Sequence, residues 1–121
     1  DDAGAVALGR YAQRIKKAGY DLLYVINESR YLTKTPEAAA AMLKEIEQAA
    51  RLSATGLVNN TNLGADTSME LIRHSAGFAD KVSFLTGLPI RFTCVPDFCA
   101  AEELPSDFFP VHRFVKAPWE E

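Results

Sequence analysis

Residues 55–64 read Thr55-Gly56-Leu57-Val58-Asn59-Asn60-Thr61-Asn62-Leu63-Gly64, a short apolar run directly followed by a polar turn. An apolar run bounded by turn residues is typical of a buried strand in a parallel sheet. The asparagines then follow the carboxyl end of that strand, which is where open α/β sheets bind their ligands. This segment therefore predicts a parallel α/β fold and the edge of the sheet that carries a site.

Further strands are expected before and after this one. Residues 22–26 are five consecutive apolar residues, which predict a central strand covered on both faces. Residues 90–95 alternate instead, with Ile90, Phe92 and Cys94 on one face, and predict a half-exposed strand near a sheet edge. Another short strand is expected within residues 111–115.

Helical patterns precede and separate these strands. The first helix is expected to carry one apolar stripe, made of Leu8, Tyr11, Ala12 and Ile15, and to end at Gly19. Thr35 and Pro36 suit the cap and first position of a second helix. Thr67 and Glu70 have the spacing of a capping box for a third helix, which Gly87 should end.

The alternation of helices and strands predicts parallel pairing with right-handed crossovers, in a three-layer α/β/α arrangement. All turns that leave the carboxyl ends of parallel strands then share one edge of the sheet. The residues expected at this ligand edge are Asn27, Arg30 and Asn60, joined by Asp1 and Asp2 if another strand precedes them.

The side chains at this edge suit a nucleotide base. An asparagine amide both donates and accepts hydrogen bonds, as the edge of a purine or a sugar requires. Asp97 could accept from an exocyclic amine, and the backbone around Pro96 could contact a base. Asparagines also simply end strands and form turns. That second interpretation is favoured for Asn60 and Asn62, and ligand contact is favoured for Asn59.

Composition limits the classes of partner and the compartment that we expect for this chain. With 121 residues, 48% hydrophobic and 24% charged, the chain has the size and content of one globular domain. A net charge of −3 favours neither nucleic acid nor an anionic membrane as a partner. Cys94 and Cys99 cannot form a disulfide framework and are too few for a zinc site, so we expect two buried thiols and a cytoplasmic protein.

Four segments also carry a family resemblance: Asp-Asp-Ala-Gly-Ala (1–5), Leu-Tyr-Val-Ile-Asn (23–27), residues 55–64, and Gly-Leu-Pro-Ile (87–90). Together they resemble the carboxyl-terminal half of bacterial P-loop ATPases of the deviant-Walker group, which includes partitioning, division-site and cobyrinate-synthase ATPase domains. The resemblance implies a partial P-loop NTPase (Rossmann-like) fold over residues 1–103. Residues 104–121, rich in aromatics and prolines, are expected to be a covering tail.

In that family an asparagine at the end of a late strand contacts the base, so the resemblance implies ATP binding through Asn59, with Pro96 and Asp97 in the next base-side loop. The chain departs from the family because it contains no G-x-x-x-x-G-K-[ST] phosphate loop. Without that loop the phosphates have no cradle and magnesium lacks its hydroxyl ligand. The chain alone should therefore bind the base without hydrolysing ATP.

The parent protein is then expected to be an ATPase whose amino-terminal half, preceding Asp1, supplies the phosphate loop and makes magnesium binding possible. A non-catalytic interaction module remains as the alternative, one that forms a homodimer or docks through an open sheet edge or the aromatic tail. An independent hydrolase is the least favoured, because the serines and histidines show no nucleophile-elbow or triad pattern. No catalytic or metal-binding residue is assigned.

Overall fold

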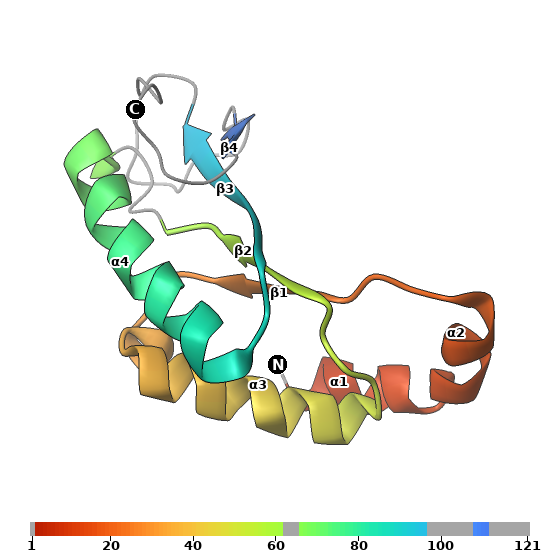
Figure 1. The fold of residues 1–121 in the computed structure, drawn as a ribbon. Helices are drawn as coiled ribbons and strands as arrows, with labels where there is room; N and C mark the ends of the chain where they lie inside the picture. Colours follow the sequence, from red (N-terminus) through yellow and green to blue (C-terminus); the bar gives the residue numbers. More distant parts are fainter. Residues whose placement is uncertain (1, 62–65, 97–107, 112–121) are drawn as a thin grey trace, which may run out of the picture.

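The structure, a computed structural model, describes residues 2–61, 66–96 and 108–111. These residues form a four-stranded sheet in the order β1 (Leu23–Ile26), β2 (Gly56–Asn59), β3 (Ile90–Pro96) and β4 (Phe108–Val111) (Figure 1). Every neighbouring pair is parallel. The predicted α/β fold with a parallel sheet is therefore confirmed.

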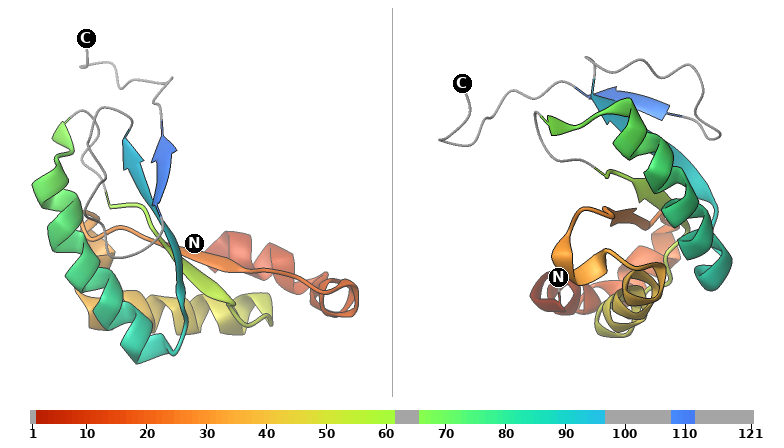
Figure 2. Two further views of the ribbon diagram at one scale, coloured as in Figure 1. Left: turned by 45° about the horizontal axis from the view of Figure 1, so that its top comes forward. Right: turned by 90° about the vertical axis from the view of Figure 1, so that its left-hand side faces the viewer.

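Two long helices connect the first three strands. Helix α3 (Pro36–Ala50) joins β1 to β2, after the short 3-10 helix η1 (Tyr31–Thr33), and α4 (Met69–Thr86) joins β2 to β3. Both lie on the same face of the sheet (Figure 2). A second helical layer is not seen among the described residues, so the three-layer arrangement stays a prediction.

The main core lies between these helices and the sheet. Ala39 from α3 and Phe78, Ala79 and Val82 from α4 pack with Ile26 and Leu57 of the strands. All of these side chains are almost fully buried. The small Ala39 and Ala79 allow the helices to come close to the sheet, and the larger side chains fill the space that remains.

The positions of two strands differ from the predictions. Strand β1 lies at an edge of the described sheet rather than at its centre, and its Val25 is 55% exposed. Strand β3 is interior, because β4 pairs with it on the side away from β2. A strand was expected within residues 111–115 and is found at Phe108–Val111. The expectation that β1 is covered on both faces is also wrong, since more than half of Val25 is exposed. Apolar patterning does not say which strands lie beside a given strand.

The expected single amino-terminal helix is in fact two, α1 (Asp2–Gly9) and α2 (Ala12–Ala18). Half of the expected stripe is wrong, because Leu8 and Tyr11 are exposed. Its other members, Ala12 and Ile15, do pack with Ala5, Ala50 and Leu52. Small residues are required there because α1 approaches α3 very closely.

The helix caps follow the sequence with one shift. The Thr35 side chain accepts a hydrogen bond from the backbone N–H of Ala38, as predicted for the cap of α3. For α4 the capping side chain is Ser68 rather than Thr67: its Oγ accepts from the N–H of Leu71 at 3.1 Å. Thr67 is buried. Gly87 ends α4 at a φ of 72°, a left-handed conformation that glycine adopts without strain.

Candidate functional site

The carboxyl ends of β1 and β2 lie level with each other. Ile26 pairs with Asn59 in the parallel register, and the N–H of Asn60 donates to the carbonyl oxygen of Ile26 at 2.8 Å. Thr93 of β3 also pairs with Asn59, and β3 continues beyond that level to the buried Pro96. The carboxyl ends of the three strands therefore lie at one edge of the sheet, as predicted.

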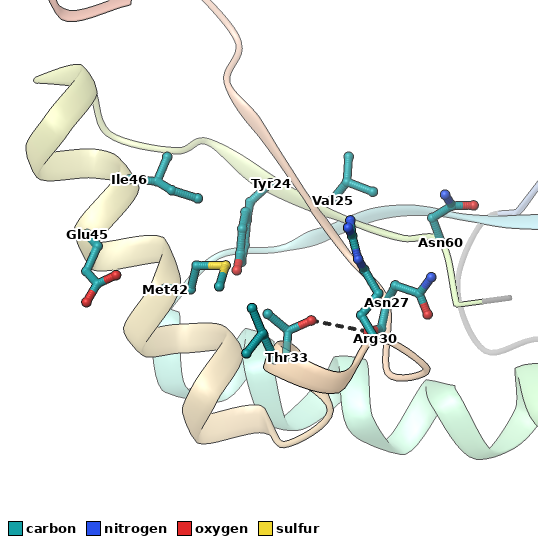
Figure 3. A pocket seen from close by; sticks show the side chains of 10 residues that line it. Tyr24, Val25, Asn27, Arg30, Thr33, Met42, Glu45, Ile46 and Asn60 are labelled. Atoms are coloured by element: carbon teal, nitrogen blue, oxygen red, sulfur yellow. Dashed lines mark hydrogen bonds between the residues drawn. The ribbon is translucent and has the colours of Figure 1, made fainter. Parts of the chain in front are cut away.

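A pocket of about 640 Å³ opens beside β1 at this edge (Figure 3). Its described lining is Tyr24, Val25, Asn27, Arg30, Leu32, Thr33, Met42, Glu45, Ile46 and Asn60. Asn27, Arg30 and Asn60, all predicted at the ligand edge, lie toward one end of the pocket, and Met42 and Ile46 lie toward the other. The structure thus brings three of the predicted ligand-edge residues together.

The polar end is shaped by a tight turn. The Oδ1 of Asn27 accepts a hydrogen bond from the N–H of Ser29 at 2.9 Å, an Asx-turn that ends β1. The Asn27 carbonyl oxygen accepts from the N–H of Arg30 and from the hydroxyl of Thr33. These bonds fold the chain into η1 and place Arg30 on the rim of the pocket.

The apolar end is built by β1 and α3. The hydroxyl of Tyr24 donates to the carbonyl oxygen of Ala39 at 2.9 Å, which ties the phenol to the first half of α3. Burial raises the pKa of Tyr24 further above neutrality, because it disfavours the charged phenolate. Together with Met42 and Ile46 the tyrosine forms an apolar wall next to amide groups. A largely apolar pocket with a few polar groups is the usual form of a small-molecule site.

Asn59 does not line this pocket. Its side chain is 1% exposed and lies against α4, where its Nδ2 donates to the Oγ of Ser75 at 2.9 Å. Its Oδ1 accepts from both the N–H and the hydroxyl of Thr61, at 3.2 and 2.8 Å. Direct contact between Asn59 and a ligand stays a prediction, and it would require these buried hydrogen bonds to break.

Sequence reasoning missed Thr61 and Ser75. A signal for Thr61 existed, because a threonine two residues after an asparagine can complete a local turn. Nothing in the sequence indicated Ser75, since its contact with Asn59 depends on how α4 packs on β2.

Glu28 connects the two turns to α4. Its N–H donates to the Oγ1 of Thr61 at 3.0 Å, and its Oε1 lies 3.1 Å from the Nδ1 of His74. The side chain of His74 is 77% exposed. Within the described ranges, no three histidine, cysteine, aspartate or glutamate side chains are close enough to hold a metal ion.

The other residues predicted at the site are the aspartates at the amino terminus and after β3. Asp2 is the first residue of α1, whereas Asp1 and Asp97 lie outside the described residues, as does Cys99. Cys94 is a free thiol that is only partly buried, and this burial raises its pKa. The expectation of a buried thiol is therefore only partly met at Cys94.

In the described part of the chain, every helix is too short or too polar to cross a membrane. No protein-family model, curated protein or solved structure matches this chain. What bears on its function is therefore the geometry of the edge where β1 and β2 end.

Proposed function

We propose that the chain is the base-binding half of a nucleotide-binding, P-loop NTPase-like domain, with ATP as the nucleotide and the cytoplasm as its compartment. The observation that carries the proposal is the placement of Asn27 and Asn60 beside each other at the carboxyl ends of parallel strands, on the rim of a pocket of about 640 Å³. In open α/β sheets this is the edge at which ligands bind. The sequence resemblance supports the same assignment.

The lining suits a base better than a phosphate chain. Asn27 and Asn60 supply amide groups, and the Tyr24 ring with Met42 and Ile46 supplies an apolar surface. Among the described lining residues, Arg30 is the only cation, and the anionic Glu45 lies in the same pocket. Asn60, just after the end of β2, lines the pocket, whereas the preceding Asn59 is buried and contacts α4. Pro96 and Asp97 would complete the base side from β3.

The described residues offer no site for magnesium or for the phosphates of ATP. The chain has no phosphate-loop motif, and the described residues offer no group of metal ligands. The complementary amino-terminal half would supply both, and the assembled protein would be the ATPase. The chain alone should bind nucleotide weakly and leave ATP unhydrolysed.

Isothermal titration calorimetry of the 121-residue chain tests the proposal. ATP and adenosine should bind with similar affinities, and tripolyphosphate should not bind, because recognition lies in the base. Asn60→Ala should weaken the binding of both ATP and adenosine by about tenfold, the contribution of one or two hydrogen bonds. Gln48→Ala removes an exposed amide of α3 outside the pocket lining and should change nothing. Failure of adenosine and ATP to bind, or binding of tripolyphosphate as tight as that of ATP, would contradict the proposal.

A second function is favoured by the β1 edge. In the described sheet β1 pairs only with β2, and its Val25 is 55% exposed. Leu32, which lines the same pocket as Val25, is 71% exposed. Strands with an open edge pair readily with other chains. An interaction or dimerisation module is therefore the alternative, and light scattering distinguishes the two.

A further inference from the structure

We infer that Asn59 is a positioning residue: through Thr61 it fixes the turn after β1 against the turn after β2, and so sets the geometry of the pocket rim. The link between this geometry and nucleotide affinity rests on the proposed function. The positioning itself is a property of the chain without nucleotide.

The hydrogen bonds form one directed series. The N–H of Glu28 donates to Thr61 Oγ1, and the Thr61 hydroxyl donates onward to Asn59 Oδ1. On its other side Asn59 donates through Nδ2 to Ser75 Oγ, and the Ser75 hydroxyl donates to the carbonyl oxygen of Ile72 at 2.6 Å. The series joins the turn after β1, the end of β2 and the first half of α4.

The side chains of this series are deeply buried, and all their polar atoms have hydrogen-bond partners. Asn59, Thr61 and Ser75 are 1%, 2% and 0% exposed. Among the described residues, no buried side-chain nitrogen or oxygen lacks a hydrogen-bond partner. The amide orientation of Asn59 is therefore determined by its neighbours, since a flipped amide would face Thr61 and Ser75 with the wrong groups. A side chain held in this way is well suited to fix its surroundings.

Thr61 is the point at which the two turns meet. Its hydroxyl accepts from one turn and donates to the strand that carries the other. A hydroxyl can do both at once, so serine can replace threonine here and valine, which has a similar shape, cannot. The residues held on either side, Asn27–Glu28 and Asn60, are next to or part of the pocket lining.

The same two strands provide a matched control at their opposite end. Thr55 lies just before β2, and its Oγ1 accepts from the N–H of Leu22 at 3.0 Å, just before β1. Thr55→Val and Thr61→Val thus each remove a threonine bridge between the same neighbouring segments. Only the second bridge lies at the pocket rim.

The experiment measures amide hydrogen exchange without nucleotide, ATP affinity by calorimetry, and stability by urea unfolding. Thr61→Val should speed exchange at Glu28 and weaken ATP binding, each by about tenfold, because buried hydrogen bonds are lost. Thr61→Ser should restore both values to nearly those of the wild type. Thr55→Val should lower stability while leaving Glu28 exchange and ATP affinity unchanged.

Unchanged exchange at Glu28 in Thr61→Val would overturn the inference, and so would equal weakening of ATP binding by Thr55→Val and Thr61→Val. If Thr61→Val does not fold, Ser75→Ala loosens Asn59 from the α4 side and gives the same comparison. If exchange responds as expected but the wild-type chain does not bind ATP, the proposed function fails and the positioning of the turns stands.

Discussion

Tyr24 combines an apolar contact with a polar one in a single side chain. Its ring packs against the main core, and its hydroxyl reaches the Ala39 carbonyl oxygen. Because burial disfavours the phenolate, the pKa of Tyr24 is raised above the ordinary tyrosine value of about 10. Tyr24 therefore affects the free energy of unfolding at neutral pH, and it makes this free energy depend on pH under alkaline conditions.

Tyr24→Phe should lower the free energy of unfolding at pH 7 by about 1 kcal/mol, through loss of the bond to Ala39. Above a pH of about 10 the unfolded wild-type chain releases the Tyr24 proton and the folded chain keeps it, so rising pH destabilises the wild type. Phenylalanine has no such proton, and the difference between the two proteins should shrink. Urea unfolding from pH 7 to pH 11 measures this; a constant difference would contradict the prediction.

Among the elements, the packing of α1 on α3 depends on the absence of a side chain at Gly9. A Cβ at Gly9 would lie 2.6 Å from the carbonyl oxygen of Ala49, closer than any real contact of this kind. The atom that it meets is backbone, so α1 would have to move. Gly77, inside α4, has nothing within 4 Å of the same position.

Replacing these two helical glycines by alanine should change the free energy of unfolding in opposite directions. Gly9→Ala should destabilise the chain by about 1–3 kcal/mol, the usual cost of overpacking a close contact. Gly77→Ala should stabilise it by about 0.5–1 kcal/mol, because alanine favours a helix over glycine. Thermal and urea unfolding of both variants measure the changes. Two shifts of the same sign would mean that the close approach of α1 to α3 does not limit stability.

At the scale of the whole molecule, one face of the described sheet is covered by helices, and one of its edges has no pairing strand. Helices α3 and α4 cover one face, whereas β1 leaves an edge unpaired in the described sheet and Val25 is half exposed there. This edge carries apolar residues and no charge within Leu23–Ile26. Charged residues on edge strands are the usual protection against pairing with other chains.

If the β1 edge mediates association, light scattering should show a dimer at high concentration, and Val25→Lys should make it a monomer by adding a charge to that edge. Phe84→Lys is the matched control, because Phe84 is 88% exposed on α4 and distant in sequence from β1. It should leave the dimer intact. A wild-type monomer at all concentrations would exclude dimerisation through this edge.

The position of three predicted residues at one edge of the sheet could be derived from the sequence, whereas their role in binding stays a prediction. Asn27, Arg30 and Asn60 could be placed at one edge because parallel strands bring the turns after them together. From the sequence, ligand contact is favoured for Asn59 rather than Asn60, whereas in the structure Asn60 lines the pocket and Asn59 is buried against α4. Successive residues of an extended chain face opposite sides, and the sequence does not say which side holds α4. The roles of Thr61 and Ser75 likewise depend on contacts between distant segments.

The sequence by itself determined the first three strands, the two long helices, most of the helix caps and the parallel direction of the sheet, because hydrophobic period and turn residues act over a few neighbours. The tertiary structure alone decided that β1 lies at an edge, that α1 and α2 are separate, and that Asn59 faces Ser75. These depend on which surfaces meet, and the free energy of such contacts comes from residues far apart in the chain.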